Sequence, residues 1–235
     1  MYTLIETRSG DMVERVKTVK MSRPQLRGEK RNITPPDMVK RNALLKQRKL
    51  TRDLAANFKN GDRLYTLSFR QNPDGKELSK IAARFFRRIK RTHPEAAIYI
   101  KVTEKGEKLG KYHFHIVMKR EVSLEAIEKA WEYGSVNVKI IYSAPDFRRL
   151  AEYLLKMHRP PGQKAWVSGR ANKKPVEKRS KLNRKSFVKV PAGSIKIRDK
   201  TYKLEDWEEH ADPFTMERVQ YAIYFLRREG QDEHS

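Results

Sequence analysis

The chain has 235 residues, and its 53 Lys and Arg residues against 29 Asp and Glu residues give a formal net charge of +24. It contains no cysteine, which excludes disulfide scaffolds, thiol nucleophiles and cysteine-ligated zinc. No stretch approaches the ~20 apolar residues of a membrane span, and the N-terminus lacks the apolar run of a signal peptide, so we expect no membrane partner. The charge predicts a polyanionic partner, most often nucleic acid.

Two segments carry most of the excess positive charge. Residues 1–60 and residues 158–185 each have a net charge of +9. Residues 1–35 have no sustained apolar pattern, and we expect them to be a flexible basic segment. The run Thr34-Pro35-Pro36-Asp37 is typical of a helix start and predicts a basic helix within residues 36–60. Residues 158–185 are rich in Pro, Gly, Asn and Lys, which predicts a basic loop.

The middle of the chain, residues 61–157, has the clearest periodicity. Alternating apolar residues predict strands, and apolar residues three and four positions apart predict helices. In chain order we expect a strand over 64–69, a helix over 77–91, strands over 97–104 and 111–119, a helix capped by Ser123, a strand over 136–142 and a helix over 145–157. The order β-α-β-β-α-β predicts an α+β fold, a ferredoxin-like split βαβ antiparallel sheet with helices on one face.

The C-terminal residues 186–235 are expected to form a small appended subdomain. A short strand is predicted over 194–202. A helix is predicted further on, because Met216, Val219, Ile223 and Leu226 fall on one helical stripe.

A His-x-His pair lies on the predicted strand over 111–119. His113 and His115 project from one face about 7 Å apart at Cα, so both imidazoles can reach one ion. Glu104 lies near the end of the preceding strand of the same hairpin, which makes a set of two histidines and one carboxylate with open positions for water or substrate. The alternative is a hairpin with two core histidines and a surface glutamate, but partly buried imidazoles need polar partners.

Tyr153 and Lys156 lie on the helix predicted over 145–157. At 100° per residue they are 60° apart, and Arg149 is 40° to the other side of Tyr153. A tyrosine flanked by two cations suits attack on a phosphodiester, because positive charge favours the phenolate and neutralises the phosphate. The alternative is a tyrosine on a helix surface with basic neighbours, which is common in a chain of this charge.

Four segments in this order carry a resemblance to a known family. They are Tyr65-Thr-Leu-Ser-Phe69, Glu104-Lys-Gly-Glu107, His113-Phe114-His115 and Glu152-Tyr-Leu-Leu-Lys156. Together they resemble the HUH (histidine–hydrophobic–histidine) endonucleases, specifically single-tyrosine rolling-circle replication initiators of phage, plasmid or integrative-element type. The likeness covers roughly residues 36–175 and implies that residues 61–157 are a nuclease domain.

The resemblance implies a mechanism, a cofactor and a setting. A divalent metal, Mg or Mn, held by Glu104, His113 and His115 would polarise the scissile phosphate of single-stranded DNA. Tyr153 would attack it to give a 5′-phosphotyrosyl link and a free 3′-OH, and Lys156 would stabilise charge in the transition state. The implied setting is the cytoplasm of a bacterial or archaeal host, in which a mobile element encodes the protein.

The expected DNA is single-stranded or a hairpin origin, bound mainly by basic side chains. The candidates are Lys40, Arg41, Arg48 and Arg52 on the N-terminal helix, Arg149 beside the tyrosine, and Trp166, Arg170, Lys173 and Lys174 in the basic loop. Trp166 either stacks on an unpaired base or covers the core. Residues 106–111 lack the spacing of a phosphate-binding Walker loop, so unwinding would need a host helicase.

Three alternatives to a replication initiator stay open. A β-α-β-β-α-β sheet can be a non-catalytic nucleic-acid-binding module, although the strand over 111–118 lacks the aromatic pattern of an RNA-recognition strand. Within the enzyme class, the same residues would serve a single-tyrosine transposase or a conjugative relaxase.

Overall fold

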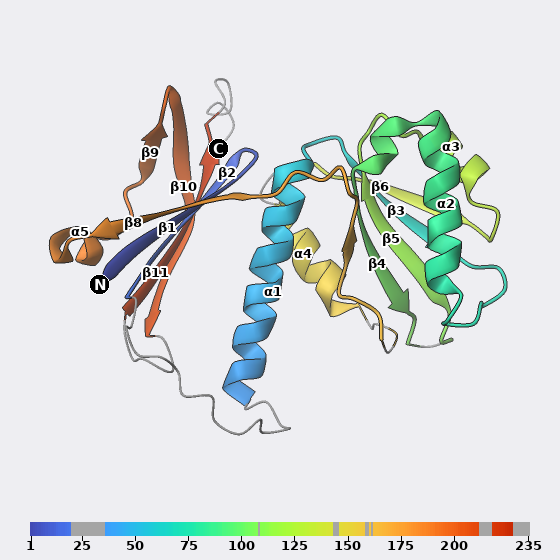
Figure 1. The fold of residues 1–235 in the computed structure, drawn as a ribbon, viewed down its shortest axis with the longest axis horizontal. Coiled ribbons are helices and arrows are strands. Elements are labelled where there is room, and N and C mark those ends of the chain that lie inside the picture. Colours follow the sequence, from blue (N-terminus) through green and yellow to red (C-terminus); the bar gives the residue numbers. More distant parts are fainter. Residues whose placement is uncertain are drawn as a thin grey trace. The chain divides into compact units, whose positions relative to one another are not determined.

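The computed structural model describes residues 1–19, 36–107, 109–142, 146–157, 160, 162–211 and 218–227. The chain divides into two compact units. One is continuous, Asn57–Lys173, and the other combines Met1–Ala56 with Lys174–Ser235. Figure 1 shows that each unit is built around its own sheet.

The continuous unit contains a five-stranded sheet in the order β6-β3-β5-β4-β7. Its strands are β3 (Arg63–Ser68), β4 (Tyr99–Lys105), β5 (Tyr112–Met118), β6 (Val136–Ile140) and β7 (Val167–Ser168). All the pairings are antiparallel. In chain order the first four strands take the arrangement 4-1-3-2, which is the ferredoxin-like split βαβ plan. The predicted fold class is therefore confirmed, and β7 adds a short strand inside the predicted basic loop.

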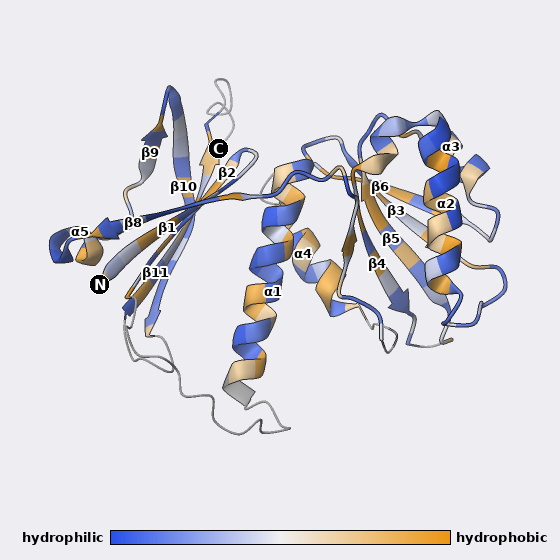
Figure 2. Ribbon diagram, viewed as in Figure 1, coloured by the Kyte–Doolittle hydropathy of each residue, from blue (hydrophilic) through white to orange (hydrophobic). Residues whose placement is uncertain are grey.

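One face of this sheet is covered by helices that the sequence predicted. They are α2 (Leu78–Thr92) and α3 (Leu124–Ala130), with the 3-10 helix η1 (Pro94–Ala97) after α2. Figure 2 shows the alternation of apolar and polar residues along α2, whose apolar side is buried in the same core as Phe114 and Ile116 of β5. The Ser123 hydroxyl accepts a hydrogen bond from the backbone N–H of Ala126 (3.1 Å), which caps α3 as predicted.

Helix α4 (Asp146–Lys156) lies on the opposite face of the sheet from α2 and α3 (Figure 1). Its side chains Phe147, Ala151 and Leu154 are buried. These are the positions that the helical stripe predicted, so the remaining side of α4 is left for residues such as Tyr153. The predicted first residue of this helix, Pro145, lies outside the described residues.

The second unit contains a six-stranded antiparallel sheet in the order β8-β1-β2-β11-β10-β9. Its strands are β1 (Tyr2–Ser9), β2 (Met12–Val19), β8 (Val176–Leu182), β9 (Ser194–Ile197), β10 (Lys200–Ala211) and β11 (Arg218–Leu226). Its helices are α1 (Pro36–Asn57) and α5 (Arg184–Val188). A small core on this sheet includes Val13, Tyr202 and Tyr224.

This second sheet corrects several expectations. Residues 2–9 and 12–19 are strands rather than a flexible segment, and residues 176–182 are a strand rather than a loop. The C-terminal region does not stand alone, because β11 pairs with β2. The predicted helix through Val219, Ile223 and Leu226 is wrong, since these residues belong to strand β11. Met216 and residues 20–35 lie outside the described residues, as does His158, where the predicted loop begins.

Gly10 shows how closely α1 packs in this unit. It occupies the two-residue turn between β1 and β2 with a φ of +57°. A Cβ at this position would lie 2.2 Å from the carbonyl oxygen of Ala55 on α1. The turn therefore requires glycine both for its left-handed backbone and for the approach of the helix. Among the described helices, none is long and apolar enough to cross a membrane.

Candidate active site

Strand β5 presents its two histidines on the face of the sheet that carries α4. The register pairs His115 with Thr66 of β3 and His113 with Glu104 of β4. Phe114, between the two histidines, points into the core with α2 and α3. The strand alternation predicted by the sequence thus separates a polar, His-bearing face from an apolar face.

Glu104 is in direct contact with His115. Its Oε2 lies 2.6 Å from His115 Nε2 and 3.9 Å from His113 Nδ1. The other ring nitrogen of His115, Nδ1, is 3.2 Å from the hydroxyl of Thr66. His115 is only 4% exposed, and burial lowers its pKa, although the neighbouring Glu104 carboxylate acts in the opposite direction. A neutral imidazole is the form that can ligate a metal.

His113 has one nitrogen that its surroundings do not satisfy. Its Nδ1 is buried and has no hydrogen-bond partner within the part of the chain that the structure describes. A buried ring nitrogen without a partner is unfavourable, and a cation or water is a natural partner for it. The two imidazole rings have centroids 6.5 Å apart.

The set of Glu104, His113 and His115 fits a divalent cation by donor type. Two imidazoles and one carboxylate form a mixed nitrogen and oxygen set suited to Mn, Zn or Mg, and the unsatisfied Nδ1 of His113 lies beside it. As they stand, the described side chains do not form a closed metal-binding group, because the Glu104 oxygen is hydrogen-bonded to His115. A bound ion would have to replace that contact.

Tyr153 of α4 lies beside this set. Its ring centroid is 6.2 Å from that of His115, and the two rings are nearly perpendicular at 89°. The side chain is 47% exposed, so its ring contacts His115 while solvent still reaches it. The helix that follows the sheet therefore brings a phenol to the same face as the two histidines.

The charges around Tyr153 differ from the expectation that two cations favour its phenolate. Burial raises the pKa of Tyr153, and the negative charge of Glu104 raises it further. The Lys156 ammonium lies 2.7 Å from Glu152 Oε1 in an exposed pair, and Arg149 is exposed on the same helix. The prediction failed because helical angles gave the positions of the cations but not the carboxylate on the neighbouring strand.

These residues line an open pocket of about 500 Å³. Its walls are Glu104, Gly106, Glu107, Leu109, Lys111, His113, Tyr153, Lys156 and Met157. The pocket unites the predicted catalytic residues and two of the three predicted metal ligands. The sequence analysis did not assign roles to Lys111, on the pocket wall, or to Thr66, against His115. Thr66 stands in the quoted segment Tyr65–Phe69, but the pairing of β3 with β5 was needed to bring it to His115.

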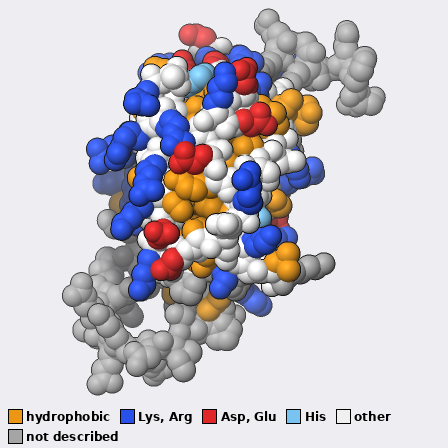
Figure 3. Space-filling view, turned by 90° about the vertical axis from the view of Figure 1, so that its right-hand side faces the viewer, with side chains coloured by type: hydrophobic (Ala, Val, Ile, Leu, Met, Phe, Trp, Pro, Cys, Tyr) orange, Lys and Arg blue, Asp and Glu red, His pale blue; other side chains and the backbone are white. Residues whose placement is uncertain are grey.

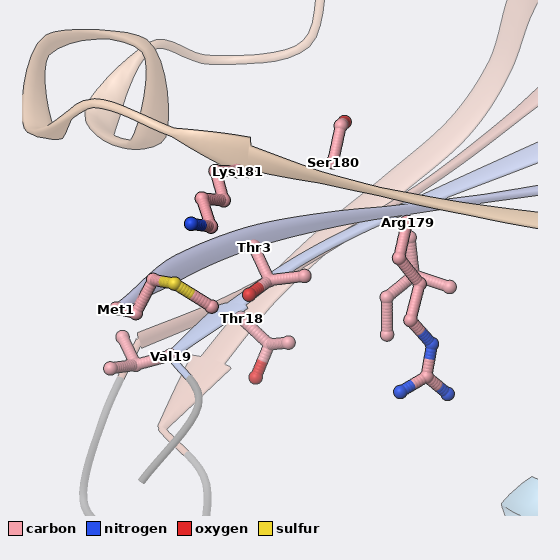
Figure 4. Close-up of a pocket in the computed structure, with 8 residues that line it drawn as sticks. Met1, Thr3, Thr18, Val19, Arg179, Ser180 and Lys181 are labelled. Carbon is pink, nitrogen blue, oxygen red and sulfur yellow. The ribbon is translucent and has the colours of Figure 1, made fainter. Parts of the chain in front are cut away.

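A second pocket of about 500 Å³ lies on the six-stranded sheet (Figure 4). It is lined by Met1, Thr3, Ile5, Thr18, Val19, Arg179, Ser180 and Lys181. None of the predicted site residues is among them. Its two cationic side chains come from β8, at the edge of the sheet.

The predicted DNA-binding residues are divided between the two units. Lys40, Arg41, Arg48, Arg52 and Lys174 belong to the unit with the six-stranded sheet, and Arg149, Trp166, Arg170 and Lys173 to the other. Arg170, Lys173 and Lys174 are exposed near β7, whereas Trp166 is half-buried. Lys40 is exposed and Arg41 is half-buried on α1.

Arg48 and Arg52 have partners inside their own unit. Arg52 pairs with the buried carboxylate of Glu14 on β2, and Arg48 pairs with Glu208 on β10. The Arg48 guanidinium also lies 3.6 Å from the ring centroid of Tyr221. Both arginines thus help to attach α1 to the sheet, because a buried carboxylate needs a cation beside it.

Residues 62–158 match a family model of replication-associated proteins, the ORF2 type. No curated protein and no solved structure matches the chain significantly. The matched segment is less than half of the chain and contains strands β3 to β6, helix α4 and every residue of the candidate active site named from the sequence. In this segment the chain is similar to replication-associated proteins.

Proposed function

We propose that this protein nicks and rejoins single-stranded DNA at a replication origin, with Tyr153 as the nucleophile. The observation that carries the proposal is the position of the Tyr153 ring 6.2 Å from the ring of His115, in a pocket shared with Glu104 and His113. The similarity of residues 62–158 to replication-associated proteins supports the same reaction class.

The proposed reaction begins with the phenol oxygen of Tyr153. It attacks phosphorus in line, forming a bond to the 5′ side of the break while the 3′ oxygen leaves and takes up a proton. The phosphotyrosyl bond keeps the energy of the broken phosphodiester, so a later attack by a 3′-OH can rejoin the strand. Because the pKa of Tyr153 is raised, the phenol holds its proton until attack.

Glu104, His113 and His115 would hold the divalent cation that this chemistry requires. When bound, it supplies Lewis-acid polarisation of the scissile phosphate. Neutralisation of the Glu104 charge would also remove one of the two causes that raise the pKa of Tyr153. Thr66 holds the His115 ring through Nδ1 and so leaves Nε2 directed at the Glu104 side of the site.

Lys156 is positioned to contact the phosphate. Its ammonium lines the pocket and is paired only with Glu152 on the exposed side of the helix. An exposed pair of this kind contributes about 0–1 kcal/mol. Lys156 can therefore exchange Glu152 for a phosphate oxygen at little cost and stabilise the charge that develops there.

The test is formation of a covalent protein–DNA adduct. The full chain is incubated with Mn²⁺ and a pool of random-sequence single-stranded DNA, and adducts are detected on a denaturing gel. We expect an adduct that Tyr153→Phe abolishes and that Tyr142→Phe keeps, since Tyr142 is an exposed tyrosine of the same unit outside the pocket. Binding without an adduct under any divalent ion would instead favour a non-catalytic module, and sequencing the trapped DNA would identify the nick.

A further inference from the structure

Helix α2 carries a second charged surface, on the layer opposite the candidate active site. Its sequence, Leu78–Thr92, contains six basic residues and no acidic one. Four of the basic residues are exposed at spacings of four, three and four, namely Lys80, Arg84, Arg87 and Arg91. We call these four side chains the α2 stripe.

The α2 stripe lies directly opposite the buried side of the helix. At 100° per residue its four members fall within an arc of about 60°, and they span about 16 Å along the axis. The buried residues, among them Ile81, Phe85 and Ile89, fall on the other side. Figure 3 views the side of the molecule that carries α2 and shows Lys and Arg side chains in a column along its left edge.

A solvated helix surface in this protein has a different composition. The exposed faces of α3 and α4 carry ion pairs four residues apart, Lys129 with Glu125 and Lys156 with Glu152, each at 2.7 Å. By contrast, no member of the α2 stripe has an ion pair with any residue that the structure describes. The nearest acid, Glu132, is paired with Arg88 beside the stripe, and its charge also reaches Arg84.

Like charges three and four residues apart on a helix repel one another. The α2 stripe contains three such neighbouring pairs in succession, so it is unfavourable unless a polyanion lies along it. The exposed side of α2 has no aromatic residue, and stacking on aromatic rings is how proteins hold unpaired bases. The stripe therefore suits phosphates in a regular, base-paired backbone rather than a single strand.

We propose that the α2 stripe binds the phosphate backbone of duplex DNA, as a surface separate from the pocket that contains Tyr153. This inference does not depend on nicking, because it concerns a different layer of the unit. A protein with both surfaces would hold paired DNA through α2 while the opposite face of the same sheet acts on an unpaired strand.

The test measures duplex binding as a function of salt. The full chain carrying Tyr153→Phe, which prevents cleavage, is titrated into a labelled duplex of about two helical turns and followed by fluorescence anisotropy. Changing all four residues of the stripe to Gln should weaken binding at least tenfold and reduce the slope of log K against log salt by about 3 to 4. The double changes Lys80→Gln with Arg84→Gln, and Arg87→Gln with Arg91→Gln, should each reduce the slope by about 2.

The matched control removes the same charge elsewhere. Lys189, Lys196, Lys200 and Lys203 are exposed in the other unit, and their change to Gln should alter the slope by less than half as much. If the stripe and control variants weaken duplex binding equally, net charge rather than α2 explains it and the proposal is wrong. With Tyr153 intact, the stripe variant should form adducts with single-stranded DNA at the unaltered rate, so loss of duplex binding and loss of nicking are distinguishable.

Discussion

The ring of Tyr153 stands nearly perpendicular to the ring of His115, with centroids 6.2 Å apart. Tyr153 belongs to helix α4 and His115 to the central strand β5, so the contact joins a helix to the polar face of the sheet. Beside it, Glu104 lies 2.6 Å from His115. A phenol, two imidazoles and a carboxylate are thus brought together by three separate elements.

The first prediction separates catalysis from folding at the histidines. His113→Ala and His115→Ala should each lower the rate of adduct formation at least a hundredfold, because the proposed site loses a ligand. Affinity for single-stranded DNA, measured by anisotropy, should change by less than about twofold, since phosphate contacts dominate binding. His93→Ala is the control, since His93 follows α2 and lies away from the pocket. If affinity falls as far as activity, the histidines are structural.

The second prediction concerns the cation itself. Titration of Mn²⁺ into the Tyr153→Phe protein, followed calorimetrically, should show one site, and Glu104→Ala should weaken it by at least about tenfold. Glu107 is the matched control, because it is a second glutamate on the wall of the same pocket but has no contact with either histidine among the interactions of the described residues. Equal losses for Glu104→Ala and Glu107→Ala would mean that the pocket attracts cations only by its charge.

The sequence predicted the continuous unit because its contacts are mostly between neighbouring elements. The hairpin of β4 and β5 faces Glu104 with His113 across one turn, so spacing alone placed them together. The contact of Thr66 with His115 needs the pairing of β3 with β5, which are separated by a helix and a strand. The raised pKa of Tyr153 likewise depends on Glu104 from another element, which helix geometry cannot reveal.

The other unit was mispredicted because its partners are distant in sequence. Strand β2 pairs with β11, about two hundred residues later, and an isolated strand of this kind gives no local signal of its partner. In β11, Val219, Ile223 and Leu226 fit a helical stripe, but the segment is rich in aromatic and β-branched residues. Such residues fit a pleated surface, and the pairing with β2 and β10 decides the conformation.

The third prediction tests how α1 is attached to the six-stranded sheet. The carboxylate of Glu14 is fully buried, pairs with Arg52 and accepts a hydrogen bond from the Tyr221 hydroxyl. Glu14→Ala should lower the free energy of unfolding of this unit by about 3–5 kcal/mol, because it leaves Arg52 and Tyr221 without their buried partner.

The control for this prediction is the second pair on the same helix. Glu208 is 45% exposed and pairs with Arg48, so Glu208→Ala should cost about 0–1 kcal/mol. Hydrogen exchange of backbone amides in β2 and β11 during mild urea treatment reports the stability of this sheet directly. Similar losses for the two variants would mean that burial of Glu14 does not determine the stability of the α1 contact.

The fourth prediction concerns a buried lysine that the proposed reaction does not use. Lys101 of β4 is 6% exposed, donates a hydrogen bond to the Thr103 hydroxyl (2.7 Å) and lies 4.5 Å from the ring centroid of Phe114. Burial lowers its pKa from 10.5 to about 8. The folded protein therefore releases this proton near pH 8, whereas the unfolded chain keeps it until about pH 10.5.

Between these two pH values the unfolded chain binds more protons than the folded protein, so the free energy of unfolding contributed by Lys101 rises with pH. The rise amounts to about 3 kcal/mol across the window and is absent below pH 8, where both states are protonated. Lys101→Met should remove the rise and stabilise the protein at pH 7, because it replaces a buried charge by an apolar side chain of similar size. Urea unfolding at pH 7, 8, 9 and 10 measures both effects, with exposed Lys76→Met as the control. A Lys101→Met protein with the same pH profile as the unaltered chain would mean that Lys101 keeps its charge in the folded state through contact with water.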